Sequence, residues 1–128
     1  MALKPKEPAN EKGEKARQLY LEMARAVVGE ANLGYESLYQ RFAENDWAAI
    51  KLDSAVALRG LQAGHSPRTV VGMLHQSPYM QHQVHQKKVP LAPMSQYARS
   101  TVAKLANQLE SARAEKSRSQ SRSSEIEL

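Results

Sequence analysis

The chain has 128 residues, of which 41% are hydrophobic and 24% charged, and this balance fits one globular domain better than two. Its 18 Lys and Arg against 13 Asp and Glu give a formal net charge of +5, which favours polyanions such as nucleic acids as partners. The absence of cysteine excludes disulfides, thiolate zinc sites and cysteine nucleophiles. No apolar run approaches the roughly 18 to 20 residues of a membrane span, and the N-terminus lacks the apolar segment of a signal peptide, so we expect a cytoplasmic protein.

A first helix is predicted from the spacing of apolar residues. Residues 1–9 alternate prolines with charged side chains and are expected to form a disordered lead-in. From about Asn10, apolar residues recur at intervals of three and four, which places them on one face of a helix. This face consists of Ala16, Leu19, Tyr20, Met23, Val27 and Ala31. Asn32 and Gly34 both tolerate the left-handed conformation that closes helices, so we expect the helix to end before them.

Two further helices follow. A second apolar stripe begins at Tyr35, and its helix is expected to end near Glu44. The side chain of Asp46 can accept hydrogen bonds from free amides, so it is predicted to cap a third helix that begins at Trp47 and reaches Gly64.

The pair Ser66-Pro67 predicts the start of a fourth helix, because serine caps the free amides and proline has none to leave unpaired. The pair Ser77-Pro78 is interpreted as its end, because the residue before a proline disfavours helical geometry. Residues 77–93 lack a sustained period and are predicted to be a long loop with room for one helical turn.

A last helix of about five turns is predicted from apolar residues that return at helical spacing. These residues are Met94, Tyr97, Ala98, Thr101, Val102, Leu105, Leu109 and Ala112. Residues 115–128 are rich in Ser and Arg, have no apolar face and are expected to be disordered. No segment requires a strand. The sequence therefore predicts an all-α fold, a single irregular bundle of four to five helices over residues 10–114 with disordered termini.

Metal binding and catalysis are not expected. His82 and His85 have the i,i+3 spacing of a helical chelate, but no Asp or Glu lies between Asp53 and Glu110 to complete a site. Asp46 and Asp53 are the only central candidates for acid-base catalysis, and Asp46 is already assigned as a cap. Phosphate-loop and nucleophile-elbow patterns are absent. We therefore expect a binding protein without a cofactor rather than an enzyme.

Residues 58–74 resemble a helix-turn-helix in the positions of their helix start and stop signals, with Gly64 at the turn and a capped second helix. Val70 and Met73 are placed to face the first helix of this unit. Its exposed side would offer four residues to DNA: Arg68, Thr69, His75 and Gln76. The alternative interpretation is an ordinary helix pair with a glycine turn, packed into the bundle.

A second basic feature consists of Lys87 and Lys88 in the loop, Arg99 and Lys104 on the last helix, and Lys116, Arg118 and Arg122 in the tail. These side chains could neutralise phosphates without sequence preference. The alternative is a solvated loop and a solubilising tail. Trp47 and Tyr97 lie on apolar stripes and are expected in the core rather than stacked on bases.

Several short motifs carry a family resemblance over residues 45–105. They are Asn45-Asp46-Trp47, Ala63-Gly64-His65-Ser66-Pro67, Gln76-Ser77-Pro78 and Tyr97-Ala98-Arg99-Ser100-Thr101-Val102. This pattern resembles the helical segment that follows the catalytic domain in plasmid replication primases and mobilisation relaxases, and it implies a DNA-associated accessory role. The acidic cluster of a primase and the metal-binding histidines and catalytic tyrosine of a relaxase have no counterpart here, so the resemblance implies none of their chemistry.

The sequence thus predicts a non-enzymatic helical accessory protein that contacts nucleic acid, DNA rather than RNA, through a basic face. This face consists of Arg68, Thr69, Lys87, Lys88, Arg99 and Lys104. The rival interpretation is a protein-interaction adaptor whose partly exposed apolar helix faces receive a partner helix. A homodimer built on the last helix is compatible with both.

Overall fold

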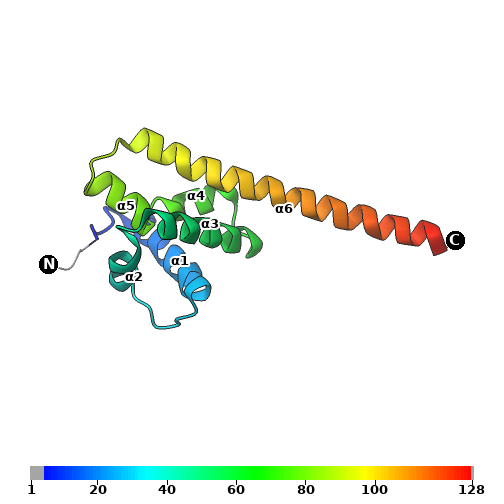
Figure 1. Ribbon diagram of the computed structural model, residues 1–128, viewed down its shortest axis with the longest axis horizontal. Helices are drawn as coiled ribbons and strands as arrows, with labels where there is room; N and C mark the ends of the chain where they lie inside the picture. The colour runs from blue at the N-terminus through cyan, green and yellow to red at the C-terminus, as the bar shows by residue number, and fades with distance from the viewer. Residues whose placement is uncertain (1–4, 128) are drawn as a thin grey trace.

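The computed structural model describes the backbone of residues 5–127 and the side chains of residues 5–114. Over this range the fold is all-α, as predicted, and no strand occurs among the described residues. The helices number six rather than four to five (Figure 1). They are α1 (Glu11–Val28), α2 (Tyr35–Phe42), α3 (Asp46–Gln62), α4 (Pro67–Leu74), α5 (Pro78–His85) and α6 (Leu91–Glu127).

The additional helix is α5, which occupies half of the segment predicted as a long loop. Ser77 and Pro78 end α4 and at the same time start α5: the Ser77 hydroxyl accepts a hydrogen bond from the Met80 amide at 3.1 Å, and Pro78 occupies the first turn. Met80 is buried in the core, which explains why this segment folds although its apolar spacing is irregular. The prediction of a loop over 77–93 was wrong because one Ser-Pro pair was interpreted only as a terminator.

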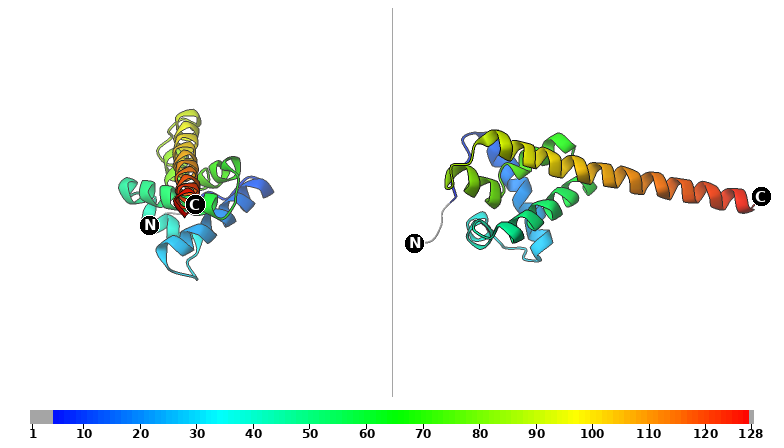
Figure 2. Two further views of the ribbon diagram at one scale, coloured as in Figure 1. Left: turned by 90° about the vertical axis from the view of Figure 1, so that its right-hand side faces the viewer. Right: turned by 45° about the horizontal axis from the view of Figure 1, so that its top comes forward.

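The bundle is organised around α3, which packs against α1, α2, α4, α5 and α6. α6 runs across the top of the other helices and projects beyond them (Figure 1), and Figure 2 shows the same projection from two further sides. The apolar core draws on all six helices. Its largest fully buried apolar side chains are Tyr20, Tyr39, Leu38, Met73, Leu74, Met80, Val56, Val70 and Val102.

Two predicted helix boundaries are displaced by a few residues. α1 ends where Gly29 adopts a left-handed conformation with φ 83°, so Ala31 lies outside the helix and not on its face. α3 is capped by Asn45, whose side chain accepts a hydrogen bond from the Ala48 amide at 3.3 Å. Asp46, predicted as the cap, is instead the first residue of α3, so its carboxylate is available for other contacts.

Trp47 is the largest departure from the predicted core. Its side chain is 72% exposed, and the ammonium of Lys51 lies 5.1 Å from the centre of its ring. Trp47 stands in the first turn of α3, whereas the buried side of this helix begins with Ala49 and Leu52. The apolar spacing therefore assigned Trp47 to the wrong side of the helix. Tyr97, also predicted as core, is half-buried.

The two ends of the chain were predicted to be disordered. Residues 5–10 form no helix, but the carbonyl of Lys6 accepts a hydrogen bond from Arg17 at 2.6 Å. The backbone of α6 extends to Glu127, but the side chains of residues 115–127 lie outside the described ones, so disorder of the tail over 115–128 stays a prediction. No helix in the described part of the chain is long and apolar enough to cross a membrane.

Candidate functional site

Asp53 is the centre of a buried polar cluster and has no exposed surface. Tyr20 donates to its Oδ1 at 2.7 Å, while Tyr97 and Ser77 donate to its Oδ2 at 2.8 and 3.1 Å. Burial raises the pKa of Asp53 to about 7, and the three hydrogen bonds oppose this rise by favouring the charged form. Because the donors come from α1, α6 and the cap of α5, the carboxylate ties these elements to α3. No reactant could reach it, so its role is structural.

Arg17 is a second buried polar residue, with 8% of its surface exposed. Its guanidinium lies 4.2 Å from the centre of the Tyr35 ring, and its Nε donates to Oε1 of Gln76 at 3.1 Å. The Tyr35 hydroxyl donates to the Gln76 carbonyl at 2.5 Å. These contacts join α1 and α2 to the end of α4, and they leave Arg17 no free face for a ligand.

Two of the four histidines, His75 and His82, have packing contacts with neighbouring helices. His75 lies between α4 and α6, with Nδ1 2.8 Å from the Val71 carbonyl and Nε2 3.0 Å from the Ser95 hydroxyl. His82 packs edge-on against Tyr39, and its Nδ1 is buried without a partner among the described residues. No group of three or more His, Asp or Glu in the described range could hold a metal ion.

The charges of the chain are unevenly distributed. Residues 54–109, which contain most of α3, all of α4 and α5 and the first half of α6, include no Asp or Glu. Six Lys and Arg side chains lie in this segment, and all are exposed. They are Arg59, Arg68, Lys87, Lys88, Arg99 and Lys104.

The predicted site residues fall into two separate groups. Lys87 and Lys88 lie in the connection between α5 and α6, where the Lys87 ammonium is 3.8 Å from the Asp46 carboxylate. Lys104 lies 13 residues after Leu91, the first residue of α6, and hence about 20 Å further along the helix axis. The six predicted residues therefore do not form one continuous face.

Arg68 of α4 and Arg99 of α6 belong to two helices that pack against each other, whereas Thr69 lies beside residues of α1. The two helices run in opposite directions (Figure 1), and the contact between His75 and Ser95 fixes their register. Arg68, two turns before His75, is therefore near the α6 segment that follows Ser95 and includes Arg99. The Thr69 hydroxyl is 3.0 Å from that of Ser66.

Lys104 lies on the opposite side of α6, because five residues after Arg99 correspond to a rotation of about 140°. It follows Tyr97 by two turns, and Tyr97 contacts Asp53 of α3. Since α3 and α6 run in the same direction (Figure 1), Lys104 is level with the last turn of α3, which carries Arg59. We call Arg59, Arg68, Arg99 and Lys104 the basic end. Sequence reasoning missed Arg59, although it shares the acid-free segment with the other three.

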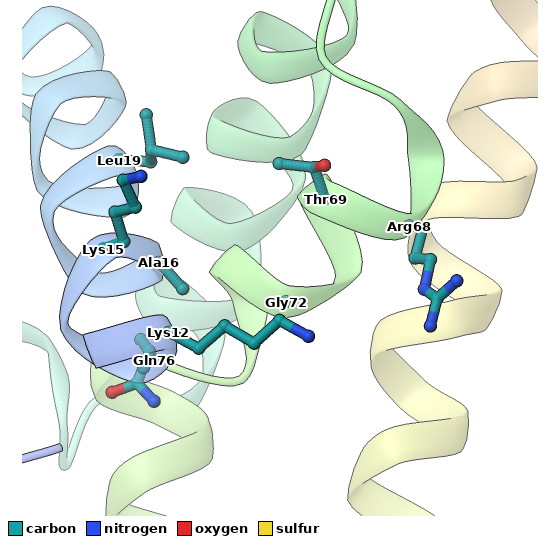
Figure 3. Close-up of a pocket in the computed structure, with 9 residues that line it drawn as sticks. Lys12, Lys15, Ala16, Leu19, Arg68, Thr69, Gly72 and Gln76 are labelled. Atoms are coloured by element: carbon teal, nitrogen blue, oxygen red, sulfur yellow. The ribbon is translucent and has the colours of Figure 1, made fainter. Parts of the chain in front are cut away.

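A groove between α1 and α4 was also missed. It has a volume of about 480 Å³, and Figure 3 shows Lys12 and Lys15 on its α1 side and Arg68 and Thr69 on its α4 side. Its floor is formed by Ala16, Leu19 and Gly72. The periodic face of α1 did include Ala16 and Leu19, but only the packing of α4 against α1 shows that both remain open to solvent.

Comparisons of the chain with protein-family models, with curated proteins and with solved structures found no match.

Proposed function

We propose that this chain is a non-enzymatic accessory protein that binds nucleic acid through the basic end. The observation that carries the proposal is the acid-free segment 54–109, which presents the four exposed cations of the basic end on α3, α4 and α6. None of the four forms an ion pair with a described carboxylate; the ion pairs of the described residues join Arg41 to Glu30 and Lys87 to Asp46.

Exposed cations without an ion-pair partner suit a phosphate backbone. Each phosphate that they neutralise releases condensed counterions, so binding weakens as the salt concentration rises. The basic end offers charge on both sides of α6, with Arg68 and Arg99 on one and Arg59 and Lys104 on the other. This arrangement favours contact with a backbone that crosses α6 over insertion of one helix into a groove.

The helix-turn-helix interpretation receives limited support. Gly64 has a φ of 97° at the corner between α3 and α4, and Gly60 lies in contact with Val70 and Met73, as the sequence predicted. However, α4 has eight residues and packs against α1, α3 and α6, which leaves mainly its first turn for a nucleic acid. We infer backbone contact by Arg68 and Thr69, with DNA preferred over RNA on the resemblance to plasmid-encoded accessory segments, in the cytoplasm.

The test is a fluorescence-anisotropy titration of the full chain against labelled single-stranded and duplex DNA and RNA at low and near-physiological salt. Binding of DNA that persists at the higher salt and survives an excess of heparin supports the proposal. Loss of all binding in the presence of heparin would show a general affinity for polyanions and would refute it.

A second function, that of a protein-interaction adaptor, is favoured by a different observation. The groove between α1 and α4 exposes an apolar floor beside three cations. A charged nucleic-acid backbone would not bury such an apolar surface, whereas a protein partner would.

A further inference from the structure

The groove between α1 and α4 combines an apolar floor with a rim of one charge sign. Ala16, Leu19 and the backbone of Gly72 form the floor, and no carboxylate lines the groove. Lys12, Lys15 and Arg68 stand around it, and none of them forms an ion pair with a described residue. An occupant must therefore bring apolar groups to the floor and acidic groups to this rim.

The apolar floor continues beyond the groove along α1. Leu19 and Met23 are half-buried, and Val27, one turn further, is 36% exposed. With Ala16 these residues are spaced at i, i+3, i+7 and i+11, which keeps them on one side of the helix over about 16 Å. A stripe of this length matches three turns of a partner helix and is longer than a compact small molecule would need.

The charge along this stripe changes sign. Lys12 and Lys15 stand at its N-terminal end, whereas Glu22 is exposed near its C-terminal half. Charge complementarity therefore requires the acidic residues of the occupant at the end that lies near Lys12, Lys15 and Arg68.

Gly72 explains why the groove is open. It lies within α4, and a Cβ placed on it would meet no other atom within 4 Å, so the missing side chain leaves space rather than relieving a contact. In contrast, a Cβ on Gly60 would lie 3.1 Å from Cγ2 of Val70. Gly72 can thus carry a side chain that fills the groove without disturbing the core.

We propose that the groove between α1 and α4, with the stripe from Ala16 to Val27, is a docking site for an acidic amphipathic helix of a partner protein. The apolar side of that helix lies on Leu19, Met23 and Gly72, and its carboxylates lie against Lys12, Lys15 and Arg68. The site is separate from the basic end except for Arg68, so it does not depend on nucleic-acid binding.

The probe is a synthetic, end-capped helical peptide of four turns with leucines at i, i+4, i+7 and i+11 and glutamates at the flanking positions of one end. A matched peptide carries lysine in place of each glutamate. Anisotropy titrations with the full chain are expected to show that the acidic peptide binds at least about tenfold more tightly than the basic one, which corresponds to ~1.4 kcal/mol.

Two variants assign the binding to the groove. Gly72→Leu fills the floor of the groove and is expected to weaken binding of the acidic peptide by about tenfold. The double variant Lys12→Glu/Lys15→Glu is expected to bind the basic peptide more tightly than the acidic one. Lys51→Glu, a single Lys-to-Glu reversal at an exposed position of α3 outside the groove, is the control for this type of substitution and should leave both affinities within about twofold. Unchanged helical circular dichroism shows that each variant is folded.

Equal binding of the two peptides, no binding of either, or full binding by the folded Gly72→Leu variant would overturn the docking site. The same samples are titrated with labelled duplex DNA. If the acidic peptide does not bind but duplex DNA does, only the docking site is refuted. If the acidic peptide binds but duplex DNA does not, only the proposed nucleic-acid function is refuted.

Discussion

Tyr97 of α6 donates a hydrogen bond to the Asp53 carboxylate of α3 across 2.8 Å, and this contact anchors the long helix to the centre of the bundle. The same carboxylate oxygen accepts from Ser77, so one buried atom connects α6, α5 and α3. The position of Lys104 relative to α3, and hence the arrangement of the basic end, depends on this anchor.

Tyr97→Phe removes the hydrogen bond and retains the ring. Because the bond is made to a buried acidic group, its loss should lower the free energy of unfolding by about 1 to 3 kcal/mol. Tyr79→Phe is the matched control, since the Tyr79 ring packs edge-on against that of Tyr97 at 5.2 Å between centroids and its hydroxyl makes no hydrogen bond to a described residue. Urea denaturation should show a change below about 0.5 kcal/mol for the control. Equal effects of the two variants would contradict the anchoring role of the Asp53 contact.

Stability should fall as the pH rises through the range set by Asp53. The pKa of Asp53 is about 7 in the folded chain against 3.8 for an exposed aspartate, so between these values the folded state retains a proton that the unfolded state has lost. The free energy of unfolding therefore decreases with pH across this window, by at most about 4 kcal/mol, and this contribution is constant above it.

Asp53→Asn should remove this part of the pH dependence, because the amide does not titrate. Urea denaturation of both proteins at pH 4, 5.5 and 8 measures the difference. Glu30, whose pKa is lowered by its hydrogen bond to Arg41, acts in the opposite sense at lower pH, but its contribution is common to both proteins. Parallel pH profiles for the two proteins would show that Asp53 titrates in its ordinary range.

Alanine at two glycines should have opposite effects on stability. Gly60→Ala places a Cβ 3.1 Å from Val70 and 3.4 Å from Met73, so it should separate α3 from α4 and destabilise the fold by about 1 to 3 kcal/mol. Gly72→Ala meets no neighbour and should stabilise α4 by about 0.5 to 1 kcal/mol, because alanine has less backbone freedom to lose. Thermal unfolding measured by circular dichroism distinguishes these outcomes, and a stabilising Gly60→Ala would be inconsistent with the close approach of the two helices.

The exposure of Trp47 can be measured directly, since the chain has a single tryptophan. Its fluorescence in the folded protein should resemble that of a solvated indole and be quenched by iodide nearly as strongly as in urea. Trp47→Gln should change the free energy of unfolding by less than about 0.5 kcal/mol, as expected for an exposed position. A blue-shifted emission that iodide quenches only weakly would show that Trp47 is buried in the core.

Local signals in the sequence located most of the helices. Ser66 caps α4 as predicted, and Val70 and Met73 face α3, the first helix of the predicted pair, where they lie beside Gly60. α5 was missed although Ser77-Pro78 has the same start signal as Ser66-Pro67, because its buried residues follow no clean period. Periodicity reports the apolar side of a helix only when that side is continuous.

The candidate site was less accessible to sequence reasoning, because it depends on distances between helices. Lys87 and Lys104 were grouped by charge alone, yet α6 separates them by about 20 Å. Arg59 and Lys12 were missed because only the packing of α3 against α6, and of α1 against α4, gives them neighbours of the same sign. Asp53 was noted as a central acid, but its three hydroxyl partners come from positions as far apart as Tyr20 and Tyr97.

The salt dependence of duplex DNA binding tests the central claim most directly. If the four cations of the basic end each neutralise one phosphate, the slope of log K against log salt concentration should be about −3.5 for the natural sequence. The double variant Arg68→Glu/Lys104→Glu should reduce the magnitude of this slope by about 2 and weaken binding at low salt, while Lys51→Glu should alter neither. An affinity and slope unchanged by the double variant would contradict the claim that the basic end binds nucleic acid.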